Sequence, residues 1–179
     1  GDPMRVYKDS KQVDMFFAIT FKNIRVAFYA FAACILLSIG SGFILLQNGI
    51  MLGAFQYFFH EQGLLFESAL TIWIHGTIEI ASIIIAGGAG LKMGNSILFP
   101  GTYPRMLSFQ RVARRGAKMV IGLVPLFIAA GFLESFVTRL TDLPTVAKLA
   151  IIGSSAFVVV YYFVIYPQKI AKHAKLLQD

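Results

Sequence analysis

Long apolar stretches dominate the chain, and each is close to the length that a membrane-crossing helix needs. The first covers residues 26–59 and contains no Asp, Glu, Lys, Arg or His. One crossing takes about 20 residues, so this stretch is too long for one crossing and too short for two. A division at Gln47-Asn48-Gly49 gives a full span at residues 26–46. We expect residues 50–59, which are shorter and rich in aromatics, to form a short external half-helix or to re-enter the membrane.

Three more apolar stretches follow, at residues 66–91, 119–137 and 149–166. Pro125 lies within the second of them and is expected to kink its helix. Pro167 follows directly after the third. The pattern therefore predicts an all-α membrane bundle with four transmembrane helices.

A basic segment lies between the second and third predicted spans. The turn signal FPGTYP at residues 99–104 is followed by RMLSFQRVARRGAK at residues 105–118, where apolar residues recur near helical spacing and no acid occurs. This pattern predicts a cytoplasmic amphipathic helix against anionic lipid headgroups. Control of topology alone would explain the same charges equally well. The expected headgroup contacts are Arg105, Arg111, Arg114, Arg115 and Lys118.

The cations predict an orientation. With four spans, 14 Lys and Arg residues fall on one side, and only Arg139 and Lys148 fall on the other. Because Lys and Arg are retained in cytoplasmic loops, both termini are expected in the cytoplasm and the chain in the inner membrane. The expected divisions are a cytoplasmic juxtamembrane segment (1–23), a transmembrane domain (24–168) and a cytoplasmic tail (169–179).

Composition supports a membrane protein and excludes other classes. Hydrophobic residues make up 57% of the 179 residues and charged residues 14%, against about 25% charged in soluble domains. A soluble enzyme of this size lacks the volume to bury so much apolar surface. The net charge of +7 lies mostly beside apolar spans, so we expect no nucleic-acid partner. The single cysteine, Cys34, excludes an intramolecular disulfide.

Five short motifs follow one another in a recognisable order. They are IHGTIEI at 74–80, AGGAGL at 86–91, FPG at 99–101 before the basic segment, GLVP at 122–125 and AGFLESFVT at 130–138. Together they resemble the stage II sporulation protein M family, over about residues 6–167. Members often carry a further N-terminal region, so we expect this chain, which begins without Met, to be part of a longer protein.

The resemblance implies an architecture more than an activity. In spore formers the family works in engulfment beside cell-wall hydrolases, for which it is thought to be a membrane scaffold. Many relatives occur in bacteria that form no spores. The resemblance therefore implies a non-enzymatic scaffold or partner in a membrane complex of the cell envelope.

Three ionisable residues fall inside the predicted spans. His75 and Glu79 are four residues apart and share a helix face, and Glu134 lies at a similar depth on the next span. A charge at the bilayer centre costs about 3 kcal/mol, so these side chains are expected to face the protein interior or water. We predict an outward-facing polar cavity around them, with further lining from Ser38, Ser41, Thr71, Ser154 and Ser155.

This cluster has two main interpretations. It either locks helix packing as a buried polar network or binds a ligand, ion or proton, as a transporter or channel requires. A metal enzyme is a remote third interpretation, because the histidine and two carboxylates are ligands that zinc accepts, but H-E-x-x-H is absent. We expect no metal and no cofactor. Small residues at helical spacing favour close packing within the monomer or a homo-oligomer seam, through Ala86, Gly90 and Gly94.

Overall fold

A computed structural model describes residues 3–36, 38–138, 140 and 143–170. All of the elements in this part of the chain are helices. Among the residues used above, Arg139 and the tail beyond Ile170, with its Lys172 and Lys175, lie outside the described residues. The all-α prediction is confirmed.

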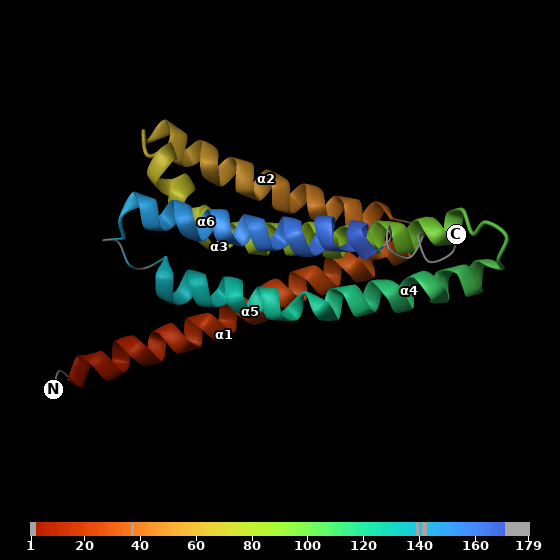
Figure 1. Ribbon diagram of the computed structural model, residues 1–179, viewed down its shortest axis with the longest axis horizontal. Helices are drawn as coiled ribbons and strands as arrows, with labels where there is room; N and C mark the ends of the chain where they lie inside the picture. Colours follow the sequence, from red (N-terminus) through yellow and green to blue (C-terminus); the bar gives the residue numbers. More distant parts are fainter. Residues whose placement is uncertain (1–2, 37, 139, 141–142, 171–179) are drawn as a thin grey trace.

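Five helices of the described chain are long and apolar enough to cross a membrane, so the count of four is not confirmed. Successive helices run in opposite directions along one common axis (Figure 1). The fifth helix arises in the N-terminal half. The sequence predicted one span at residues 26–46 and a half-helix at residues 50–59, whereas the structure has two long helices there. The five cover Lys11–Ala32, Ile39–Glu61, Leu65–Leu98, Arg105–Val137 and Thr145–Ile170.

The first predicted span, residues 26–46, is broken in the structure. Helix α1 covers Pro3–Ala32 and α2 covers Ile39–Glu61, with a 3-10 turn, η1 (Ala33–Leu36), between them. The chain reverses at Ser38, whose φ of 74° is left-handed. The following Gly40 packs tightly, since a Cβ there would lie 2.5 Å from the carbonyl oxygen of Ala33. The predicted boundary between residues 23 and 24 falls inside α1.

The predicted half-helix at residues 50–59 is wrong, because these residues form the second half of α2. The Asn48 side chain donates a hydrogen bond to the carbonyl oxygen of Ile44, four residues earlier, so this polar position continues the helix. No Cβ contact constrains Gly49. The break at residues 47–49 that the sequence predicted therefore does not occur.

The basic segment is not a separate surface helix. Helix α4 (Arg105–Gly122), α5 (Val124–Phe132) and a π-helical turn, η2 (Leu133–Val137), form one long rod (Figure 1). The rod is interrupted at the buried Leu123, and Pro125 lies in the first turn of α5, where its missing N–H leaves no bond unmade. Pro125 therefore lies next to the interruption of the rod, and the predicted kink stays a prediction.

Helix α3 (Leu65–Leu98) is the centre of the bundle and packs against α1, α2, α4, α5 and α6. Helix α6 (Thr145–Val160) continues into a second π-helical turn, η3 (Tyr161–Ile165). The core is formed mainly by α1, α3, α4 and α5, while the outer faces of α2 and α6 expose apolar side chains. The core cluster contains Ala27, Ile83, Ala86, Val120, Leu123 and Phe127.

The small residues of α3 let three helices approach closely. A Cβ at Gly90 would lie 2.6 Å from Ser41 Oγ and 2.7 Å from the carbonyl oxygen of Ala30. A Cβ at Gly94 would overlap the backbone and side chain of Ser38. The structure shows small-residue packing within one chain, and a homo-oligomer seam stays a prediction.

The Gly90→Ala substitution should lower the thermal stability of the detergent-solubilised protein, by about 1–3 kcal/mol of unfolding free energy. The added methyl group must displace the backbone of α1. Gly88→Ala is the matched control, because no atom lies within 4 Å of a Cβ there. Equal melting temperatures for the two variants would contradict the close packing.

Five alternating helices place Pro3 and Ile170 at opposite ends of the bundle (Figure 1). The expectation that both termini lie in the cytoplasm depended on four crossings. With five, the N-terminal end of α1 lies at the same end of the bundle as the turn between α2 and α3, and the turn between α3 and α4 lies at the other end (Figure 1).

Single cysteines introduced into a Cys34→Ala background test this topology. The exposed positions Lys11 and Gln62 should react with an impermeant thiol reagent from the same side, and exposed Thr102 from the opposite side. Labelling of positions 11 and 102 from the same side would instead support four crossings.

Candidate intramembrane polar site

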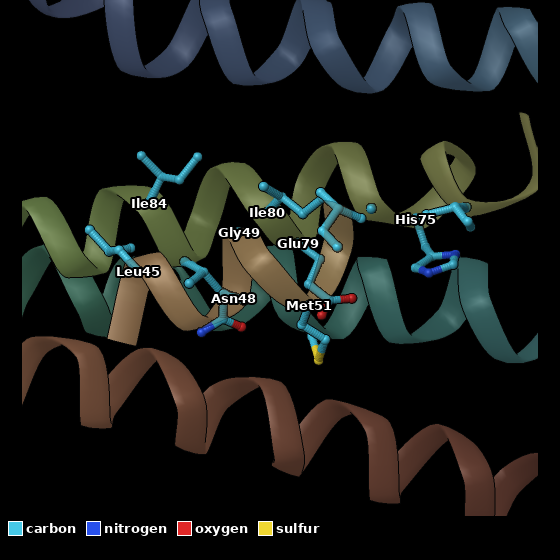
Figure 2. Close-up of a pocket in the computed structure, with 12 residues that line it drawn as sticks. Leu45, Asn48, Gly49, Met51, His75, Glu79, Ile80 and Ile84 are labelled. Atoms are coloured by element: carbon cyan, nitrogen blue, oxygen red, sulfur yellow. The ribbon is translucent and has the colours of Figure 1, made fainter. Parts of the chain in front are cut away.

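Helix α3 supplies two of the ionisable groups. His75 and Glu79 leave α3 on the same side, because residues four apart on a helix are neighbours (Figure 2). At 1.5 Å per residue, Glu79 lies roughly 21 Å from the start of α3 at Leu65, in the interior of the apolar span. Both side chains are therefore at a depth where lipid provides no compensation for charge.

The π-helical turn η2 supplies the third group, Glu134. The N–H of Thr138 bonds the carbonyl oxygen of Leu133, five residues earlier, at 2.8 Å. Such wide turns inside helices often occur at functional sites. Here the turn directs the half-buried Glu134 carboxylate and the Thr138 hydroxyl toward α3.

The structure brings the three groups together. One ligand atom from each of His75, Glu79 and Glu134 lies within 4.8 Å of the others. His75 Nε2 and Glu134 Oε2 lie 4.0 Å apart, with side-chain exposures of 15% and 31%. The cluster thus links the centre of the bundle, α3, to the end of the α4–α5 rod.

Hydrogen bonds around Thr138 determine the imidazole tautomer. The Thr138 hydroxyl donates to the carbonyl oxygen of Leu133 at 3.1 Å, and His75 Nδ1 lies 3.3 Å from the same hydroxyl oxygen. Because the hydroxyl hydrogen is already used, Nδ1 must be the donor and carry a hydrogen. In neutral His75, the lone pair of Nε2 therefore faces the carboxylates, which also offer only lone pairs when ionised.

Helix α1 adds two residues that the sequence analysis assigned to the cytoplasmic flank. The Asn23 side chain, only 5% exposed, hydrogen-bonds Glu79. The Lys22 charge acts on both Glu79 and Glu134. A sequence signal for this inward face exists, because small and polar residues that are buried in the structure recur every three or four positions along α1 and η1: Thr20, Asn23, Ala27, Ala30 and Cys34.

Two cavities meet at the cluster. A cavity of about 230 Å³ lies between α2 and α3 and includes Asn48, His75 and Glu79 (Figure 2). A second, of about 500 Å³, reaches from the turn between α2 and α3 to His75 and is also lined by Glu134. Since His75 lines both, the polar site is open on two sides within the bundle.

The predicted lining residues divide into two groups. Thr71 lines the larger cavity. Ser38, Ser41, Ser154 and Ser155 line neither cavity.

Two of these serines lie far from the cluster because α2 starts at Ile39. Ser38 Oγ donates to the carbonyl oxygen of Leu91, roughly 24 Å along α3 from His75. Ser41 packs against Gly90 in the same region. The prediction that they share a cavity with the cluster is therefore wrong.

The five basic residues of α4 are all exposed, and the Arg111 guanidinium lies 4.2 Å above the centre of the Tyr103 ring. Their contact with lipid headgroups stays a prediction.

The helices and the site define a membrane protein with ionisable groups inside its bundle. A comparison with protein-family models matches residues 2–139 to stage II sporulation protein M. The chain therefore belongs to the stage II sporulation protein M family, as its motifs predict. No curated protein and no solved structure shows a significant similarity to it. The cluster residues His75, Glu79 and Glu134, and Lys22, Asn23 and Thr138 beside them, lie within the matched segment.

The tautomer can be tested by ¹⁵N NMR of histidine-labelled protein in detergent micelles, with His75→Asn used to assign the signal. We expect neutral His75 to carry its hydrogen on Nδ1. Thr138→Val removes the acceptor and should shift the population toward the Nε2 tautomer, while Thr138→Ser should preserve it. A majority Nε2 tautomer in the parent protein would contradict the hydrogen-bond assignment.

Proposed function

We propose that the protein is a non-enzymatic transporter or channel for a cation, a proton or a metal ion, with His75, Glu79 and Glu134 as its intramembrane binding site. The observation that carries the proposal is the convergence of their ligand atoms within 4.8 Å. Carboxylates within an apolar bundle persist where a positive charge compensates them.

The balance of charge supports a cationic occupant. Two ionised carboxylates carry two negative charges, and Lys22 supplies only one positive charge among the groups shown to act on them. The imidazole, as the neutral Nδ1 tautomer, adds a lone pair rather than a charge. A bound proton or metal ion would neutralise the excess and separate the facing lone pairs.

The proposed orientation places the turn between α3 and α4 in the cytoplasmic end of an inner-membrane protein. Among the described residues, six cations lie toward that end and four, Arg5, Lys8, Lys11 and Lys148, lie toward the other. The larger cavity then opens toward the outside. The cations of the cytoplasmic end are Lys92, Arg105, Arg111, Arg114, Arg115 and Lys169.

Transport can be measured after reconstitution into liposomes, with a pH dye for proton flux and a metal-sensitive dye for Zn²⁺ entry. Glu79→Gln and Glu134→Gln should lower the flux by about tenfold or more, because each removes a compensating charge from the apolar span. Glu61→Gln is the matched control, since Glu61 is exposed at the end of α2. Parent protein that conducts neither ion above empty liposomes would reject transport.

A second candidate, a membrane scaffold or partner in a cell-envelope complex, is favoured by the family membership. In that case the polar cluster would act only in helix packing. Cluster variants that remain folded would then keep any co-purifying envelope proteins, and the parent protein would show no flux.

A further inference from the structure

We propose that His75, Glu79 and Glu134 form a binding site for a divalent first-row transition-metal ion of the Zn²⁺ type. The inference rests on the proposed function for the location of the site and adds the chemical class of the cation. Its evidence is the donor set, the positions of the ligand atoms and the residues that orient them.

The ligand atoms are nearly as close as a shared metal requires. Bonds of about 2.0–2.2 Å in tetrahedral geometry place ligand atoms roughly 3.4 Å apart. The atoms of this cluster lie within 4.8 Å of one another, and His75 Nε2 and Glu134 Oε2 are 4.0 Å apart. Side-chain rotations that move the ligand atoms by about an ångström would bring them to the separation that a metal requires, without movement of α3 or η2.

Two of the ligands are already oriented by neighbours. Thr138 accepts the hydrogen of His75 Nδ1, which leaves the Nε2 lone pair toward the carboxylates. Asn23 bonds the Glu79 carboxylate from α1. Partners of this kind fix the orientation of metal ligands, and their loss typically weakens metal binding about 10–100-fold.

The donor set selects a class of metal. Mg²⁺ and Ca²⁺ prefer oxygen ligands alone, whereas an imidazole with two carboxylates suits Zn²⁺ and related ions. Three protein ligands leave a fourth position for water, and the cavities on both sides of His75 give room for it. An open fourth position suits an ion that must enter and leave.

Lys22 competes with a metal for the same carboxylates. Its charge acts on Glu79 and Glu134, but its side chain is exposed and has room to move away. Replacement of Lys22 by the similarly long, neutral methionine should therefore tighten metal binding. A site used only for helix packing gives no such gain.

The experiment is a Zn²⁺ titration of the purified full chain in nanodiscs, by calorimetry with a competing chelator. We expect one site in the parent and affinity reduced about tenfold or more in the ligand variants, as follows from loss of one of three ligands. Mg²⁺ and Ca²⁺ should not compete. The variants are His75→Asn, Glu79→Gln and Glu134→Gln; the matched controls are His60→Asn and Glu61→Gln.

Two further variants keep the test decisive if a ligand substitution prevents folding. Thr138→Val should weaken Zn²⁺ binding about 10–100-fold through the orientation of His75. Lys22→Met should strengthen it, and Lys11→Met, on the exposed start of the same span, should leave it unchanged. Absorption spectroscopy at the zinc edge should show one nitrogen ligand from imidazole among oxygens.

The inference is overturned if the parent does not bind Zn²⁺. It is also overturned if the parent, the Thr138→Val variant and the ligand variants that fold all bind Zn²⁺ with equal affinity. Proton flux that depends on Glu79 without Zn²⁺ binding overturns the metal site and keeps the proposed transport function. Site-specific Zn²⁺ binding without any flux keeps the metal site and overturns transport.

Discussion

An unpaired charge has a high free energy in an apolar medium, and this constraint determines which side chains meet at the centre of the bundle. Glu79 and Glu134 come from segments far apart in the sequence, and each needs partners that its own helix does not supply. The partners come from α1 as well as from α3 and η2. Three separate rods must therefore converge at one depth, which fixes how α1 and the α4–α5 rod pack on α3.

Two kinds of helix contact divide α3 along its length. Toward its C-terminal end, Gly90 and Gly94 allow the backbones of α1, of η1 and of Ser38 to lie close to it. Toward its N-terminal end, the isoleucine and histidine side chains hold α2 further away, and the cavities lie there. The same helix thus provides a rigid contact at one end and an accessible polar site at the other.

The sequence predicted the helical class and the three central residues of the site, because both depend on local patterns. Charge-free stretches predict membrane helices, and the spacing of His75 and Glu79 places them on one face. The sequence did not predict where the first long apolar stretch breaks. The break was expected at Asn48, because asparagine favours turns, but α2 accommodates Asn48 through a side-chain bond to the carbonyl oxygen of Ile44. The actual reversal depends on the left-handed Ser38 and on its contacts with α3, which are tertiary.

That early error explains why Lys22 and Asn23 were missed. With the first span starting at residue 26, both residues appear to precede the membrane. Once the reversal is placed at Ser38, Lys22 lies roughly 15 Å from the end of α1 at Ala32, within the span and with its side chain exposed at the surface of the bundle. The assignment of a charged residue to flank or interior therefore depended on a turn more than ten residues away.

The π-helical turn at Leu133–Val137 has a mechanical consequence. It accommodates one more residue per turn than the rod before it, and a single carbonyl, that of Leu133, accepts bonds from both the backbone and the hydroxyl of Thr138. Contraction to an ordinary turn would rotate the following residues by roughly 100°, the angle between neighbours on a helix. The carboxylate of Glu134 and the hydroxyl of Thr138 are thereby coupled through one local backbone register.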